Sequence, residues 1–303
     1  MPTNEELTPE LSLAKNGKSF DWAGRLLNNE IGRDAAQLYS FCRILDDMAD
    51  GDIPNGPQRL LAVRFGLSNR STSEDLILME LTNFIVRKKI PFEIIIEMID
   101  GLLQDQNIVA VKDEDELLQY CYRVAGTVGL MMSQMLGCTD KNALLHAIDL
   151  GIAMQLTNIA RDVLEDAKMD RRYLPASWFD APLSPETIAN AANDCHLPVA
   201  AAINQLLELA DRYYASALVG IHLLPWRSRF SIIVALRVYG QIGRQLKRGG
   251  LQWWRGRTVV NKITKARLSI TSLSDLISGM ALKKVPQHEA TLHRDLKGLA
   301  GVD

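Results

Sequence analysis

Two stretches of the chain carry acidic side chains at the spacing of one helical turn. The first, YSFCRILDDMAD, spans residues 39–50, and the second, QLTNIARDVLED, spans residues 155–166. We call them the first and second acidic stripes. On a helix, Asp46 and Asp50 of the first stripe are four residues apart and share one face, with Asp47 on the flank.

The second acidic stripe repeats this arrangement over a longer face. Asn158, Asp162 and Asp166 follow one another at intervals of four residues, and Glu165 lies one turn after Asp162. An arginine precedes the acids in each stripe, as Arg161 does here. The two stripes therefore predict two helices that each present a row of oxygen ligands.

Carboxylates placed this close together need a compensating charge. Like charges one turn apart destabilise a helix by a few tenths of a kcal/mol per pair, and neighbouring carboxylates resist ionising together. Both stripes lie in otherwise apolar sequence, so we expect the acids to face inward. Hard oxygen ligands suit Mg²⁺, which proteins usually hold with one or two carboxylates plus substrate phosphates. The stripes thus predict a magnesium site that binds a phosphate-bearing substrate.

The acidic residues have two simpler explanations. A single DDxxD often forms only a solvated helix face, but a second matching stripe on another apolar helix argues against this. A calcium loop would match Asp46, Asp50 and Gly51 at positions 1, 5 and 6. It fails because Met48 occupies position 3 and Pro57 replaces the bidentate glutamate of position 12.

The near-neutral net charge of −2 over 303 residues conceals an uneven distribution. Residues 1–211 carry 18 basic and 32 acidic side chains, a net charge of −14. Residues 212–274, which we call the basic arm, carry twelve Lys or Arg and no Asp or Glu. An acidic body followed by a cationic segment suggests that the basic arm meets an anionic partner.

Apolar residues recur at helical spacing through most of the chain, and strand-like alternation is nearly absent. Thr139, Asp140 and Asp113 are placed to cap helices. We expect one all-α domain of about eight to twelve helices, a size at which a bundle can enclose a pocket. The predicted helical segments are 32–50, 74–88, 92–107, 115–136, 141–166, 197–221 and 227–247.

Several classes of protein are excluded. No uninterrupted apolar run approaches the ~18–20 residues of a membrane span, and the polar, acidic N-terminus is neither a secretory signal nor a transit peptide. The four cysteines form no CxxC pair, which favours small buried residues in a reducing cytosol over a disulfide scaffold or a cysteine zinc site.

Three long motifs resemble those of the squalene/phytoene synthase family. They are the first acidic stripe, YCYRVAGTVGLMM at 120–132, and GIAMQLTNIARDVLEDA at 151–167 followed by RRYLPASW, in that order. LPWRS and RVYGQIG, further along, are similar to the bacterial phytoene synthase branch. The resemblance implies an all-α, isoprenoid-synthase-type helical bundle enclosing a central cavity. Residues 1–303 would form a single domain, with a mobile N-terminal segment of about residues 1–18.

The resemblance also implies roles for particular residues. Metal binding is expected of Asp46, Asp47, Asp50, Asp162, Glu165 and Asp166. Positions near the diphosphates and the reacting carbons are expected for the catalytic residues Tyr39, Arg43, Arg161 and Tyr239. Substrate binding is expected of Lys18, Ser19, Phe20, Gln155, Asn158 and Arg237. Many relatives have a serine immediately before the K-S-F segment, whereas this chain has Gly17, so a hydroxyl contact with diphosphate is lost there.

The implied activity is head-to-head (1'-1) condensation of two geranylgeranyl diphosphates to phytoene. It would depend on Mg²⁺ or Mn²⁺, pass through a cyclopropylcarbinyl diphosphate, need no NADPH and serve carotenoid biosynthesis. Squalene or dehydrosqualene synthesis from farnesyl diphosphate stays open as an alternative, as does a non-catalytic prenyl-lipid-binding protein, although that would not need both stripes. A terpene cyclase would place Ser or Thr at Arg161, and a chain-elongating prenyltransferase would usually have a second DDxxD where RDVLED stands.

The basic arm has three candidate partners. Diphosphate is favoured for Arg237, because it adjoins Tyr239. Anionic lipid suits the region 226–267, where Trp253 and Trp254 lie between arginines, and implies peripheral membrane association. Nucleic acid is not expected, because no recognition motif appears. We expect a cytoplasmic protein. We also expect it to attach peripherally to the cytoplasmic face of the membrane.

Small residues on the YCYRVAGTVG helix have two interpretations. Ala125, Gly126 and Gly129 would allow a prenyl chain to approach the backbone, or they would allow two helices to pack tightly together. Spacing does not separate these interpretations.

Overall fold

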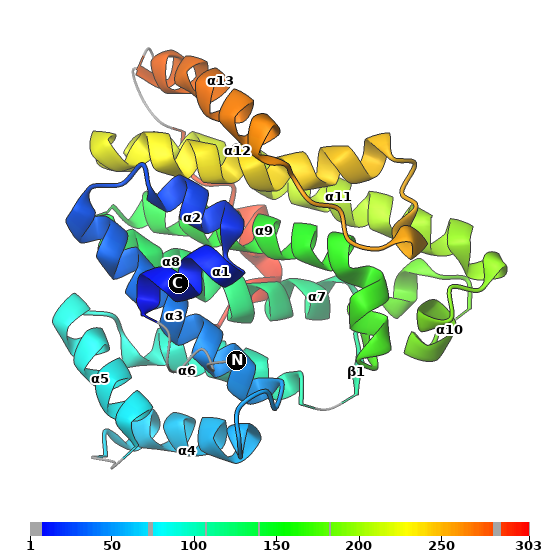
Figure 1. The fold of residues 1–303 in the computed structure, drawn as a ribbon, viewed down its shortest axis with the longest axis horizontal. Helices are drawn as coiled ribbons and strands as arrows, with labels where there is room; N and C mark the ends of the chain where they lie inside the picture. Colours follow the sequence, from blue (N-terminus) through cyan, green and yellow to red (C-terminus); the bar gives the residue numbers. More distant parts are fainter. Residues whose placement is uncertain are drawn as a thin grey trace.

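Helices make up nearly all of the regular structure (Figure 1). The structure is a computed structural model that describes residues 8–71, 75–106, 108–138, 140–181, 183–280 and 286–302. In these ranges the α-helices are α1 (Pro9–Asn16), α2 (Lys18–Gly24), α3 (Asn29–Ala49), α4 (Gly56–Asn69), α5 (Leu76–Lys88), α6 (Phe92–Gln104), α7 (Glu114–Cys121), α8 (Thr127–Met135), α9 (Lys141–Lys168), α10 (Pro185–Ala189), α11 (His196–Gly220), α12 (Trp226–Arg248) and α13 (Lys262–Met280). The all-α prediction is confirmed.

All seven predicted helical segments are present, with ends that differ from the prediction by at most three residues. Side-chain caps fix several of these ends. Asp140 Oδ1 accepts the Ala143 amide at 3.1 Å, and Asp113 Oδ1 accepts the Glu116 amide at 2.9 Å, as predicted. Thr139, the other predicted cap, lies outside the described residues.

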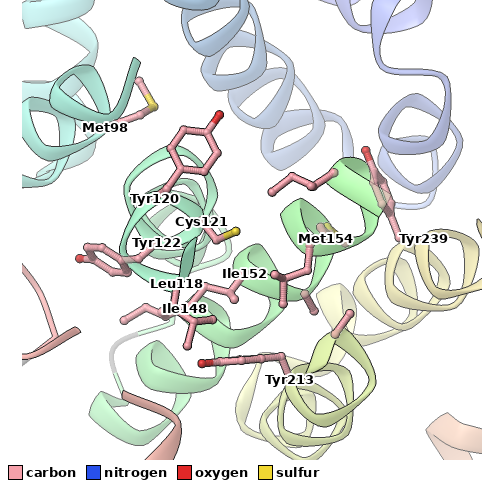
Figure 2. Close-up of a cluster of buried hydrophobic side chains, with 14 of the residues drawn as sticks. Met98, Leu118, Tyr120, Cys121, Tyr122, Ile148, Ile152, Met154, Tyr213 and Tyr239 are labelled. Atoms are coloured by element: carbon pink, nitrogen blue, oxygen red, sulfur yellow. The ribbon is translucent and has the colours of Figure 1, made fainter. Parts of the chain in front are cut away.

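Helix α9 forms the centre of the bundle and carries the second acidic stripe. It packs against α11, α8, α10 and α12. Figure 2 shows Ile148 and Ile152 of α9 among Leu118 of α7 and Tyr213 of α11. By length and composition α9 is the one described helix that could cross a membrane, but 61% of its most apolar window is buried inside the bundle. This is the pattern of a core helix.

The small residues of the YCYRVAGTVG segment pack against α9. A Cβ on Gly129 would collide with the backbone oxygen of Ala147, and one on Gly151 would collide with that of Ala125. Between α7 and α8 the helix widens into one π-helical turn, η2 (Tyr122–Gly126). For Gly129 and Ala125 the structure therefore supports tight helix packing, with backbones in close approach.

A short parallel strand pair joins two loops beside α9. β1 (Val109–Ala110) pairs with β2 (Arg171–Arg172), with Val109 opposite Arg171. β1 follows the end of α6, and β2 follows the end of α9. The pairing therefore brings the loop after α6 to the acidic end of the second stripe.

Two long helices escaped prediction, α4 and α13. Pro57 lies in the first turn of α4, a position where proline is tolerated. In the sequence alone, the same proline suggests the end of a helix. α13 is rich in Ser and Thr and has a weak apolar face. The predicted mobility of residues 1–18 stays a prediction. Residues 1–7 lie outside the described ranges, while α1 packs on α3 with Leu13 buried.

Candidate active site

The first acidic stripe occupies the C-terminal half of α3 with its arginine in place. Arg43 Nη1 donates to Asp46 Oδ2 at 2.7 Å, and Arg43 Nη2 pairs with the buried Asp47. Burial raises the pKa of Asp46 to about 7, against the opposing effect of Arg43, and the nearby carboxylates of Asp50, Asp47 and Asp105 raise it further. The charge of Arg43 therefore offsets only part of the cost of burying this carboxylate among others.

The second stripe lies near the C-terminal end of α9. Arg161 binds Asp162 through both Nε and Nη2, at 2.7 and 2.5 Å. A second arginine, Arg257 of the basic arm, reaches the same carboxylate at 2.9 Å. Burial, and then the charge of Asp162, raise the pKa of Asp166 to about 8.

Asp105 links the two stripes. It stands at the C-terminal end of α6, where the Tyr120 hydroxyl donates to its carboxylate at 2.8 Å. Its charge raises the pKa of both Asp46 and Asp166, so it lies near both stripes. Burial raises the pKa of Asp105 itself to about 6. The predicted convergence of the two stripes on one site is consistent with this coupling.

Arg171 of β2 is the cation within this group of acids. Its Nη2 donates to Asp50 Oδ1 at 2.7 Å and to the Asp105 carbonyl oxygen at 3.3 Å. It also opposes the rise in the pKa of Asp166. Sequence analysis named neither Asp105 nor Arg171 as a site residue. Arg171 belongs to the quoted RRYLPASW segment, whereas Asp105 has no spacing signal.

Some oxygen atoms at the second stripe have no partner in the described structure. Asn158 Oδ1 and Glu165 Oε2 are buried and accept no hydrogen bond, while Asn158 Nδ2 donates to Gln155 Oε1 at 3.3 Å. Unsatisfied buried oxygens are costly, and a hard cation would satisfy them. Among the described residues no three acidic groups of the stripes have ligand oxygens mutually within 4.8 Å. The unpartnered oxygens of Asn158 and Glu165, with the carboxylates beside them, are donors of the kind that a hard cation such as Mg²⁺ accepts.

Aromatic rings gather beside the arginines. Phe20 of α2 lies 5.0 Å from Tyr239 of α12 and 6.2 Å from Tyr39 of α3, measured between ring centroids. Burial raises the pKa of Tyr239 to about 12, and the charges of Arg161 and Arg257 oppose the rise. Burial also raises the pKa of Tyr39. Tyr39 is thus a neutral group near Arg43 of the first stripe, and Tyr239 is a neutral group near Arg161 and Arg257 at the second stripe.

The K-S-F segment forms the first turn of α2. Lys18 is exposed, Ser19 is half-buried, and the Lys18 carbonyl oxygen accepts a hydrogen bond from Lys265 Nζ of α13 at 2.9 Å. A Cβ on Gly17 would come within 2.8 Å of Tyr39 Cζ. Gly17 therefore leaves room for the Tyr39 ring, a reason for glycine that the sequence did not show.

Arg237 and the tryptophans lie differently from what was expected. Arg237 is held by Asp275 of α13 in a bidentate pair at 2.8 Å, so the described contacts do not join it to the acids. The expectation of a lipid-facing ring was wrong for Trp253, while Trp254 is half-buried. Trp253 is 3% exposed, and Trp254 stacks on His196 with centroids 3.8 Å apart, because the turn that carries them folds against α11.

Two hollows were found next to these elements. One, of about 10 Å³, is lined by Asp166, Arg171 and Tyr173 among others, and the second, of about 20 Å³, lies between α9, α11 and α12. Both are below the ~300–1,000 Å³ of ordinary ligand pockets. The cavity for polyprenyl tails therefore stays a prediction.

Comparison with known proteins gives consistent matches. The family model for squalene/phytoene synthase matches residues 13–264. A phytoene synthase from Pseudescherichia vulneris is 32% identical over 290 residues, which cover 91% of this chain and 93% of the relative. A 15-cis-phytoene synthase from Paracoccus sp. is 35% identical over 276 residues, which cover 86% of this chain and 88% of the relative.

The fold has a counterpart of known structure. The crystal structure of a dehydrosqualene synthase in complex with ligand superposes with a TM-score of 0.76 at 25% sequence identity. The match covers 89% of this chain and 95% of that one. The arrangement of helices is therefore shared over nearly the whole length of both proteins.

Proposed function

This chain belongs to the squalene/phytoene synthase family, and we propose that it is the prenyltransferase that condenses two geranylgeranyl diphosphates head to head to give phytoene. Relatives that are phytoene synthases match at 31–35% identity over most of both chains, which supports this choice of product. The observation that carries the proposal is the meeting of two acidic stripes around Asp105 and Arg171.

The acidic residues fit Mg²⁺, with Mn²⁺ as a substitute. Asp46 and Asp50 would hold it on the first stripe, and Asp162, Glu165 and Asp166 on the second, together with diphosphate oxygens. When bound, the metal supplies positive charge to the departing diphosphate. The raised pKa values of Asp46 and Asp166 and the unpartnered Glu165 oxygen support this assignment.

The arginines at the two stripes would bind the diphosphates directly. Arg43, Arg161, Arg171 and Arg257 each pair with an acidic residue of the stripes. When those carboxylates bind a metal ion in place of the arginines, the guanidinium groups can donate to diphosphate oxygens. Negative charge develops on these oxygens as the carbon–oxygen bond breaks. Their fixed positions also hold the two substrates next to each other.

The rings of Phe20, Tyr39 and Tyr239 would shield the reacting carbons. They pack together beside Arg161, and their apolar faces exclude water from an allylic cation. The condensation begins with loss of one diphosphate and one proton, which gives the cyclopropylcarbinyl diphosphate. Loss of the second diphosphate and a second proton then gives the C40 triene centre. No hydride is required, so NADPH has no role.

Product mass tests this proposal. The purified protein is incubated with Mg²⁺ and either the C15 or the C20 diphosphate, with and without NADPH. A C40 hydrocarbon formed from the C20 substrate without NADPH is the expected result. A C30 product would favour the squalene or dehydrosqualene alternative, and binding of both substrates without turnover would favour a prenyl-lipid-binding protein.

We also propose a cytoplasmic protein that attaches peripherally to membranes through the region 226–267. Trp226 is 73% exposed and Ile263 is 83% exposed, and Ile270 of α13 lies two turns beyond Ile263. Lys262 and Arg267 are exposed beside these isoleucines. Apolar side chains among cationic ones suit an anionic lipid surface, from which the prenyl substrates would be drawn.

A further inference from the structure

Three of the chain's five histidines converge on one buried aspartate, away from the acidic stripes. Asp149 lies on α9, more than three turns before Asp162, and is fully buried. His146 comes from the same helix, whereas His288 and His293 come from the C-terminal segment 286–302. In Figure 1 this segment is red, and it meets α9 where His288 contacts Asp149. The cluster plays no part in the proposed condensation.

The side chains of this cluster lie at metal-site distances from each other. His288 Nε2 is 2.8 Å from Asp149 Oδ2, and His146 Nδ1 is 3.8 Å from the same oxygen. Among the described residues, His146, Asp149 and His288 are the one group of three His, Cys, Asp or Glu side chains whose ligand atoms all lie within 4.8 Å of one another. Donors around a tetrahedral zinc, with bonds of about 2.0–2.1 Å, are separated by about 3.3 Å.

The surroundings orient these side chains. Ser216 of α11 donates to Asp149 Oδ2 at 2.5 Å and lies 2.8 Å from His146 Nδ1, while His293 Nε2 is 2.8 Å from the other carboxylate oxygen, Oδ1. A Cβ on Gly220 would collide with His146, so glycine makes room for this imidazole. Hydrogen bonds of this kind from neighbouring groups hold metal ligands in position.

Two ring nitrogens in the cluster, His146 Nε2 and His293 Nδ1, have no partner in the described structure. His146 is 4% exposed, and its Nε2 is buried without a hydrogen bond in the described structure. A buried imidazole nitrogen of this kind is costly unless a donor or a metal meets it. Asp149 meets the Nε2 atoms of His288 and His293, and Ser216 meets His146 Nδ1, but these contacts leave His146 Nε2 and His293 Nδ1 without a partner.

We propose that His146, Asp149 and His288 bind a zinc ion that fastens the C-terminal segment to helix α9. Two imidazoles and one carboxylate are a ligand set that zinc accepts, and Mg²⁺ does not favour imidazole. Binding displaces the proton that His288 Nε2 shares with Asp149. Because the ligands are buried and lie on two segments far apart in sequence, the ion stabilises the contact between the C-terminal segment and α9.

Metal content and cobalt absorption test the site. The full-length protein is stripped with a chelator, loaded with Zn²⁺ under excess Mg²⁺, dialysed and analysed for bound metal. The expected result is about one Zn²⁺ per chain, and a Co²⁺-loaded sample with the intense visible absorption of tetrahedral nitrogen and oxygen ligation. If the wild-type protein retains no Zn²⁺, the proposal is overturned. The cluster is then only a hydrogen-bonded contact between the C-terminal segment and α9.

Variants separate this site from the catalytic one. His146→Gln and His288→Gln keep an amide in place of the imidazole, and each is expected to lower the bound zinc from about one to about zero per chain. His222→Gln, the same change outside the cluster, and Asp46→Asn, at the first stripe, should both retain about one. Zinc retained by both cluster variants, or lost only in Asp46→Asn, would contradict the site. Circular dichroism checks that the variants are folded.

Discussion

Arg257 Nε lies 2.9 Å from Asp162 Oδ1, although 95 residues separate the two in the chain. This pair is where the basic arm meets the second acidic stripe. It explains part of the uneven charge distribution, because one cation of the basic arm pairs with a carboxylate of the acidic residues 1–211. Most other charges of the basic arm lie elsewhere, as Arg237 does on Asp275.

Arg257 should matter for diphosphate binding. Arg257→Gln removes a charged donor next to the second stripe, and we expect kcat/KM for geranylgeranyl diphosphate to fall by about 10- to 100-fold. This is less than the ~10²–10³-fold loss in kcat for a buried donor, because Arg257 is half-exposed. Steady-state kinetics provide the measurement. Arg255→Gln, an exposed arginine two residues away, is the control, and equal losses in both variants would mean that general charge is responsible.

The acidic site should make the metal-free protein less stable as pH rises. Burial raises the pKa of Asp166 to about 8, whereas the unfolded chain has a value near 4. Between these two values the folded state binds more protons than the unfolded state, so the contribution of Asp166 to the free energy of unfolding falls as pH increases. Asp166→Asn removes this contribution.

The measurement is thermal unfolding of both proteins in chelator from about pH 5 to 8.5. The Tm of Asp166→Asn should be close to that of the wild type at the acid end and exceed it increasingly toward the alkaline end. Mg²⁺ should raise the wild-type Tm most at high pH, because the ionised carboxylates bind it. A difference in Tm that is constant across this range would argue against the buried, uncompensated carboxylate.

Gly17 should resist replacement by serine. A Cβ at this position would lie 2.8 Å from Tyr39 Cζ and 3.0 Å from Leu13 Cδ1, so Gly17→Ser must displace the Tyr39 ring. We expect a loss of about 1–3 kcal/mol in stability and a lower turnover. Denaturant unfolding and kinetics check both. Gly24→Ser, where the nearest atom is 3.9 Å away, should leave stability nearly unchanged.

The exposed isoleucines of α13 should contribute to lipid binding. Replacing Ile263 and Ile270 by Gln removes two exposed apolar side chains, and co-sedimentation with vesicles containing anionic lipid should fall. Leu197→Gln, a similarly exposed apolar residue on α11, serves as the control. Unchanged partitioning of the double variant would defeat the membrane proposal for this helix.

Helical periodicity located seven helical segments, among them α9 and α11, whose apolar faces are buried along most of their length, but it missed α4 and α13. The acidic stripes could be predicted from residue spacing, because the members of each stripe lie on a single helix. Asp105, Arg171 and Arg257 could not be found in this way. Each stands at or beyond the end of its element, and only the β1–β2 pairing and the fold of the basic arm bring them to the acids.

The environment of Trp253 shows the same limit. In the sequence it lies between Arg248 and Arg255, which suggests a surface, but the indole is 3% exposed and donates to the His196 carbonyl oxygen at 3.3 Å. Local composition does not reveal this contact, because α11 supplies it from 57 residues away.

The central claim is that two prenyl diphosphates lose both diphosphate groups in one site without reduction. The most direct measurement is the ratio of diphosphate released to C40 hydrocarbon formed, from geranylgeranyl diphosphate and Mg²⁺ with no NADPH present. The account predicts two diphosphates per hydrocarbon in the wild type, and neither product in Asp46→Asn or Asp162→Asn that retain wild-type helicity. One diphosphate per prenyl product, with a C20 or chain-elongated compound in place of the C40 hydrocarbon, would contradict it.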